Sequence, residues 1–210
     1  MLLKKKFIII FIFILVILST LIFIEFNTKF TLIGNIPKMI NNEKGILFIG
    51  SHNFEHKDIF ITFKQFEKIN QKFYMLFANK RWNYLLEPFR PNNIEFIYVK
   101  EKTVEYLSSK LLLGQNIIMF LYSESDSTGP FYIIKNTKCP LVLLKIKKNK
   151  NSKINKNTLI KNHYNSSFKE IYMNNFMANF SLEIKKMKYN ISKFTNCKNF
   201  IKELKFNLYK

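Results

Sequence analysis

The chain has 210 residues, with 34 lysines and arginines against 14 aspartates and glutamates, and a formal net charge of +20. Beyond an apolar N-terminal segment, this length suits one domain that needs no disulfide support, and two cysteines are too few to indicate an oxidising compartment. Lysine supplies nearly all of the positive charge, which argues against nucleic-acid binding, where arginine makes bidentate contacts. We expect the lysines to favour anionic lipid headgroups instead.

Residues 7–24 form an uncharged apolar segment whose only polar side chains are Ser19 and Thr20. As a helix it would be about 27 Å long, close to the roughly 30 Å hydrocarbon core of a bilayer. Lysines at positions 4–6 precede it, so the positive-inside rule places the N-terminus on the cytoplasmic side. The segment predicts a membrane anchor over residues 1–26, followed by a domain over residues 27–210. A helix lying in one leaflet and a cleaved signal peptide are the alternatives, and the second is disfavoured because no small-residue cleavage site follows.

From position 44 onward, short apolar runs alternate with helical patterns, which predicts an α/β domain with a mostly parallel central sheet flanked by helices. The expected strands are residues 45–49, 72–78, 94–99, 116–122 and 140–146. The expected helices are residues 58–70, 103–113 and a short one opening with Pro130. Because residues 116–122 are apolar throughout, this strand is expected near the middle of the sheet.

The C-terminal part begins with a polar stretch over residues 147–161, which we expect to be exposed. An apolar stripe at helical spacing follows, made of Phe194, Cys197, Ile201, Leu204 and Leu208. This stripe predicts a basic amphipathic helix that packs on the domain, with contact to a lipid surface as the alternative.

Polar residues gather between the first expected strand and the first helix, where positions 51–58 hold two of the chain's three histidines. A histidine beside a carboxylate can act as a general base, because the carboxylate orients the imidazole and stabilises its protonated form. His52 or His56 with Asp58 is therefore the candidate pair, although polar residues before a helix also commonly serve as caps. A second polar loop, residues 123–129, follows the expected central strand, where open α/β sheets bind their ligands.

Four stretches follow one another in a familiar order: GILFIGSHNFEHKDIF, IEFIYVK, NIIMFLYSESDSTG and CPLVLLKI. Over residues 44–147 the chain thereby resembles the glycerolipid acyltransferases of the lysophosphatidate acyltransferase type. In that family a membrane segment precedes a strand ending in Ser-Asn-His, followed by four residues and Asp. A later strand runs into Phe-Pro-Glu-Gly-Thr-Arg-Ser.

The resemblance implies that a histidine paired with Asp58 takes the proton from an acceptor hydroxyl. Without a gap, however, Asn53 occupies the position of that histidine, and His52 lies one place early. An asparagine accepts no proton, so either a one-residue insertion lets His52 reach Asp58, or His56 substitutes, or acyl transfer has been lost. We favour His52.

The loop departs from the family pattern as well, since its arginine is missing and its glutamate is displaced by two positions. The basic residue that the family has at the end of a strand is matched by Lys100, which the resemblance implies to contact an acceptor phosphate. The implied substrate-binding positions are Asn53, Lys100, Ser123, Glu124 and Gly129. Donors within residues 123–129 would stabilise the oxyanion.

The expected function is therefore that of a membrane-bound acyltransferase of phospholipid biosynthesis. It would transfer a fatty acyl group from an acyl-CoA or acyl carrier protein thioester to the hydroxyl of a lysophospholipid or a glycerol phosphate. Its expected partners are membrane lipid and the thioester donor, with no metal, no other cofactor and no nucleic acid. One alternative is an inactive acyltransferase-like membrane protein that binds lipid or a partner. Another is a membrane-anchored glycosyltransferase, in which Glu124 and Asp126 would be the metal-binding pair.

Overall fold

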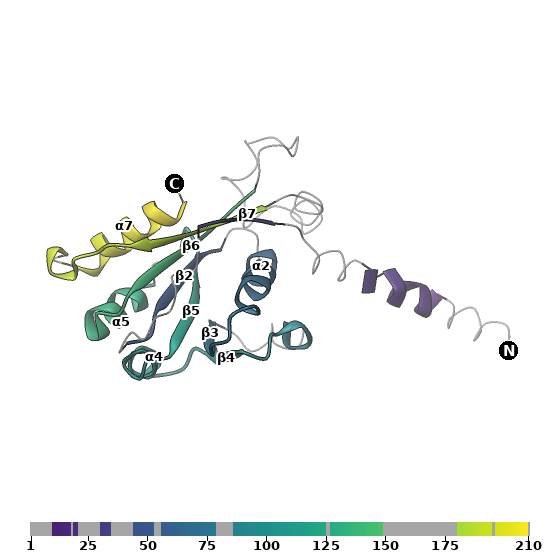
Figure 1. The fold of residues 1–210 in the computed structure, drawn as a ribbon, viewed down its shortest axis with the longest axis horizontal. Helices are drawn as coiled ribbons and strands as arrows, with labels where there is room; N and C mark the ends of the chain where they lie inside the picture. Colours follow the sequence, from purple (N-terminus) through teal and green to yellow (C-terminus); the bar gives the residue numbers. More distant parts are fainter. Residues whose placement is uncertain are drawn as a thin grey trace. The chain divides into compact units, whose positions relative to one another are not determined.

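A seven-stranded sheet, in the order β1-β7-β6-β2-β5-β3-β4, forms the centre of the part of the chain that the structure describes (Figure 1). The structure is a computed structural model that describes residues 10–17, 19–20, 30–34, 44–52, 56–78, 86–124, 127–148, 180–194 and 196–209. The strands are β1 (Phe30–Ile33), β2 (Leu47–Ser51), β3 (Phe73–Phe77), β4 (Ile94–Tyr98), β5 (Asn116–Leu121), β6 (Leu141–Lys148) and β7 (Phe180–Met187). The helices are α2 (His56–Phe66), α4 (Thr103–Leu112), α5 (Gly129–Thr137) and α7 (Cys197–Tyr209), with short 3₁₀ turns η2 (Glu87–Phe89) and η4 (Ile191–Lys193).

Five neighbouring strands run in parallel. β2 pairs with β5 and β6, and β3 pairs with β5 and β4, all in parallel register. The carboxyl ends of these strands therefore meet at one edge of the sheet. The predicted α/β class with a mostly parallel sheet is confirmed, and so is the inner position of the strand over residues 116–121, which lies between β2 and β3.

Helices cover both faces of the sheet, with α2 on one face and α4, α5 and α7 on the other (Figure 1). The α2 face is packed with aromatic rings: Phe66 of α2 lies edge-on to Phe48 of β2 and Phe73 of β3, with ring centroids 5.0 and 4.7 Å apart. The opposite face is mainly aliphatic, and its fully buried members include Leu47, Ile117, Leu107, Leu111, Ile134 and Leu204. Two separate cores thus hold the sheet from its two sides.

Helix α2 differs from its prediction at both ends. It begins at His56, two positions early, and ends at Phe66 instead of residue 70. The early end has a physical cause, because the amide of Asn93 donates hydrogen bonds to the carbonyl oxygens of Phe66 and Ile69, at 2.8 and 2.7 Å. These bonds satisfy carbonyl groups that would otherwise continue the helix. Every residue from 57 to 63 is buried, so the first half of this helix is covered on all sides.

The C-terminal helix is confirmed as a packed element, since Phe200, Ile201, Leu204 and Leu208 of α7 are buried. The helix starts at Cys197, so Phe194 precedes it and instead packs its ring 5.1 Å from that of Phe200. Strands β1 and β7 were not predicted. Most of the predicted exposed stretch over residues 147–161 lies outside the described residues.

By its internal contacts the chain divides into two units, one made of Thr31–Lys147 with Ser181–Lys210 and the other of Met1–Phe30 with Lys148–Phe180. In the second unit, residues 10–17 and 19–20 of the predicted anchor are helical, and the eight apolar side chains from Ile10 to Ile17 are 43 to 65% exposed. Within the described ranges, no helix has the length and apolar character needed to cross a membrane. The rest of the predicted anchor lies outside these residues, and the anchor and the boundary at residue 26 stay predictions.

Candidate functional site

His52 and Asp58 meet at the carboxyl end of the central strand β2. His52 directly follows this strand, and Asp58 lies in the first turn of α2. The Nδ1 atom of His52 is 3.1 Å from Oδ2 of Asp58, which is within hydrogen-bond distance. Asp58 is fully buried, and the side chain of His52 is 13% exposed. Five residues separate His52 from Asp58, one more than separate the histidine from the aspartate in the family pattern, and this longer connection still brings the imidazole to the carboxylate.

Two aromatic rings from the end of β5 enclose the imidazole of His52. The ring centroid of Tyr122 lies 4.3 Å from that of His52, and the ring centroid of Phe120 lies 5.5 Å away. Gly50 makes this arrangement possible, since a Cβ atom built there would be 2.5 Å from the ring of Phe120. With Asp58 on one ring nitrogen and aromatic rings beside it, the imidazole has little freedom to rotate.

Helix α7 fixes the backbone of His52. The backbone N–H of His52 donates to the carbonyl oxygen of Leu121 and to the hydroxyl oxygen of Tyr209, both at 3.2 Å. The hydroxyl of Tyr209 in turn donates to the carbonyl oxygen of Leu121. Burial, more than the nearby negative charge of Asp58, raises the pKa of Tyr209, so this hydroxyl keeps its proton and remains a donor.

Ser51, the last residue of β2, is bonded to the neighbouring strand. Its side-chain oxygen is buried and accepts a hydrogen bond of 3.0 Å from the backbone N–H of Ile146 in β6. The end of β2 is thus held from β5, β6 and α7. These contacts hold the position of the residue that carries the imidazole.

The arrangement around His52 suits proton transfer. When Nδ1–H donates to Asp58, Nε2 carries the ring's lone pair and can accept a proton from a hydroxyl group. The buried carboxylate then stabilises the imidazolium that forms. The geometry therefore has two parts of a general base system, an acceptor nitrogen and an orienting carboxylate.

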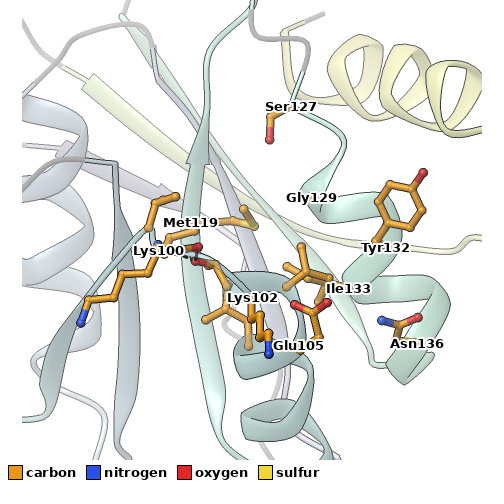
Figure 2. A pocket seen from close by; sticks show the side chains of 14 residues that line it. Lys100, Lys102, Glu105, Met119, Ser127, Gly129, Tyr132, Ile133 and Asn136 are labelled. Carbon is orange, nitrogen blue, oxygen red and sulfur yellow. Dashed lines mark hydrogen bonds between the residues drawn. The ribbon is translucent and has the colours of Figure 1, made fainter.

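Lys100 and Gly129 come together in a different place, a pocket of about 510 Å³ between α4 and α5 (Figure 2). Gly129 begins α5, and Lys100 follows β4 and accepts a hydrogen bond from the hydroxyl of Thr103 at its carbonyl oxygen. The pocket has a mixed lining. Its apolar members are Leu76, Val99, Val104, Leu107, Met119 and Ile133, and its polar ones include Lys102, Thr103, Glu105, Ser127, Tyr132 and Asn136.

The pocket and His52 lie on opposite faces of the sheet. Side chains alternate along a strand, and Met119 of β5 faces the pocket while its neighbour Phe120 contacts His52. In the strand order β5 and β3 lie between β2 and β4, so the ends of β2 and β4 are separated by about 14 Å at ~4.8 Å per strand. The structure therefore brings Lys100 and Gly129 together but keeps both apart from His52.

The remaining predicted residues are placed only in part. Ser123 and Glu124 are described and exposed. His56 is the first residue of α2, and its side chain lies outside what is described, as do Asn53 and Asp126. Among the described side chains, no group of three His, Cys, Asp or Glu residues is placed to hold a metal ion.

Comparison with known proteins adds no relative: no protein-family model matches the chain, and no curated protein matches it significantly. The resemblance to the glycerolipid acyltransferases therefore remains a prediction from the motifs.

The sequence does not predict the contacts that three residues make with His52, namely Phe120, Tyr122 and Tyr209. Phe120 and Tyr122 fall in the stretch compared with the family loop, but nothing in the sequence directs them toward His52. Tyr209 follows Leu208 at the end of the apolar stripe, which predicts packing and not a contact with the site.

Proposed function

We propose that the chain is a membrane-bound acyltransferase in which His52 is the general base and Asp58 orients it. The observation that carries the proposal is the 3.1 Å contact between His52 Nδ1 and Asp58 Oδ2 at the carboxyl end of β2. Ligands of open α/β sheets bind at this edge. The proposed acceptor is the hydroxyl of a lysophospholipid or a glycerol phosphate, and the proposed donor is a fatty acyl thioester.

In the proposed reaction, Nε2 of His52 takes the proton of the acceptor hydroxyl as its oxygen attacks the thioester carbonyl carbon. The new ester C–O bond forms, the C–S bond breaks, and the leaving thiolate receives the proton from the imidazolium. The buried carboxylate of Asp58 holds Nδ1 protonated throughout, which keeps Nε2 free to exchange the proton.

The N-terminal helical residues support the membrane part of the proposal. The apolar side chains of residues 10–17 are exposed, as lipid-facing side chains would be. The segment's two polar side chains, Ser19 and Thr20, both donate hydrogen bonds to the carbonyl oxygen of Val16, at 2.9 and 2.8 Å. Hydroxyls bonded within their own helix suit an apolar surrounding, because these two polar groups then need no other partner.

The test is an acyl-transfer assay with the purified full chain in a mild detergent, using an acyl-CoA donor and lysophosphatidate or glycerol 3-phosphate as the acceptor. Asp58→Asn should lower kcat by about 10²- to 10⁴-fold, because an amide does not hold the productive tautomer or stabilise the imidazolium. His52→Ala should lower it by a similar factor, and the double variant should be no worse than either single one.

His163→Ala is the matched control, because it removes the chain's third histidine, and it should retain activity. Wild-type activity that His52→Ala leaves intact would show that His52 is not the base. If the folded chain shows no transfer with any acyl thioester, the second candidate, an inactive module that binds lipid or a partner, is favoured. The separation of Lys100 from His52 is the observation that speaks for this second candidate.

A further inference from the structure

Three lysines of α7 line another pocket, and its Thr128 lies between Ser127 and Gly129 of the pocket between α4 and α5. The pocket has a volume of about 390 Å³, and the described residues that line it are Thr128, Ile201, Lys198, Lys202 and Lys205. The three lysines stand four and three positions apart, so they lie along one face of the helix. Lys198 and Lys202 are exposed, and Lys205 is half-buried.

Among the described residues, no carboxylate balances the charges of these lysines within the pocket. Glu203, the one carboxylate within α7, does not line it. The ion pairs found in the described part of the chain involve other lysines and Arg90. Like charges one helical turn apart destabilise a helix, and a bound anion would remove this repulsion.

The start of α5 adds a second source of positive potential. Thr128 directly precedes Gly129, the first residue of this nine-residue helix. The N-terminus of a helix attracts anions, because its first backbone N–H groups and its dipole carry partial positive charge. Thr128 makes no side-chain capping hydrogen bond to the helix, so its hydroxyl is not engaged there. The helix start and the lysines thus meet at one pocket.

We propose that this pocket, formed by Lys198, Lys202 and Lys205 of α7 with Thr128 at the start of α5, binds a phosphate monoester group. A compact, doubly charged anion matches three ammonium groups, which act as point charges and set no planar geometry. The group can belong to an anionic lipid headgroup or to a small free phosphate. The proposal does not depend on acyl transfer, because no residue of the His52 site lines this pocket.

The test is a calorimetric titration of the full chain in a neutral detergent at low salt with two probes, inorganic phosphate and dioctanoyl phosphatidic acid. Dioctanoylglycerol, which lacks the phosphate, is the control ligand. The variant Lys198→Gln/Lys202→Gln removes two exposed lysines, and Lys135→Gln/Lys186→Gln makes the same change in net charge at exposed positions outside the pocket. Circular dichroism verifies that both variants are folded.

Binding of at least one phosphate probe is expected, and the Lys198/Lys202 variant should weaken it roughly thirtyfold, while the control variant changes it less than twofold. Binding of both probes identifies the phosphate group alone as sufficient. Binding of the phosphatidic acid alone identifies a lipid headgroup. The proposal is overturned if neither probe binds, if dioctanoylglycerol binds equally well, or if the two variants weaken binding to the same extent.

Discussion

Replacement of Tyr209 by phenylalanine tests whether α7 fixes the end of β2. The ring of Tyr209 would stay, but its hydroxyl would no longer accept from the His52 N–H or donate to the carbonyl oxygen of Leu121. A net hydrogen bond contributes roughly 0.5 to 1.5 kcal/mol to stability. Because the His52 N–H still donates to Leu121 at 3.2 Å, neither backbone group is left without a partner. We therefore expect a loss of about 1 to 2 kcal/mol in the free energy of unfolding.

For a chain of this size, such a loss lowers Tm by about 2 to 8 °C. The measurement is thermal unfolding of the full chain in a mild detergent, followed by circular dichroism. Tyr106→Phe is the control, because the side chain of Tyr106 is 45% exposed on α4 and its hydroxyl has no hydrogen bond within the described residues. If Tyr209→Phe unfolds at the wild-type temperature, the hydroxyl does not hold the strand end, and the fixed backbone of His52 must have another cause.

Two further changes test the packing that surrounds the site. Asn93→Asp should destabilise the chain more than Asn93→Ala, because a carboxylate would face the carbonyl oxygens of Phe66 and Ile69 where the amide now donates. In urea unfolding, the free energy of unfolding of the Asp variant should be about 1 to 3 kcal/mol lower than that of the Ala variant. Equal stabilities of the two variants would contradict the capping role of Asn93. Gly45→Ala should cost at least about 3 kcal/mol, because its Cβ would lie 1.9 Å from the backbone oxygen of Gln115, which is too close for any side-chain adjustment. Gly114→Ala is the control, since a Cβ atom there would meet open space. Only the positive φ of 76° opposes this substitution, at a cost of about 1 to 2 kcal/mol. A smaller loss of stability for Gly45→Ala than for Gly114→Ala would contradict the close approach of Gly45 to Gln115.

The sequence predicted the elements whose residues repeat at a clear period. The apolar run over residues 116–121 and the stripe of α7 were found because each buries one continuous set of apolar side chains. β7 was not predicted, although Phe180, Leu182 and Ile184 alternate with Ser181, Glu183 and Lys185 as in a half-buried strand; Lys186 ends this short alternation. β1 has only four residues, which is too short for a period to show.

The site was predictable only where its parts are near in sequence. His52 and Asp58 are six residues apart, and a loop before a helix can bring them together. Tyr209 is 157 residues from His52, and no local pattern indicates that contact. The order of motifs along the chain predicts that Lys100 and His52 serve the same site. The distance between them, however, depends on the order of strands in the sheet. Because β5 and β3 lie between β2 and β4, the two residues are separated.

The central position of β2 has a consequence for the synthesis of the chain. The backbone N–H of Ile46, which precedes this strand, donates a hydrogen bond to the side chain of Asn116, 70 residues later. At the other end of the strand, the N–H of His52 donates to the hydroxyl of Tyr209, which is 157 residues further along the chain. At about 5 to 20 residues per second, translation takes ~4 to 14 s to reach the first partner and ~8 to 30 s to reach the last. We expect this strand, whose five residues are all buried in the folded chain, to emerge from the ribosome early and to stay unpaired for that time. A nascent chain in this state exposes both strand edges, so a nearby bilayer or a chaperone would have seconds in which to bind it.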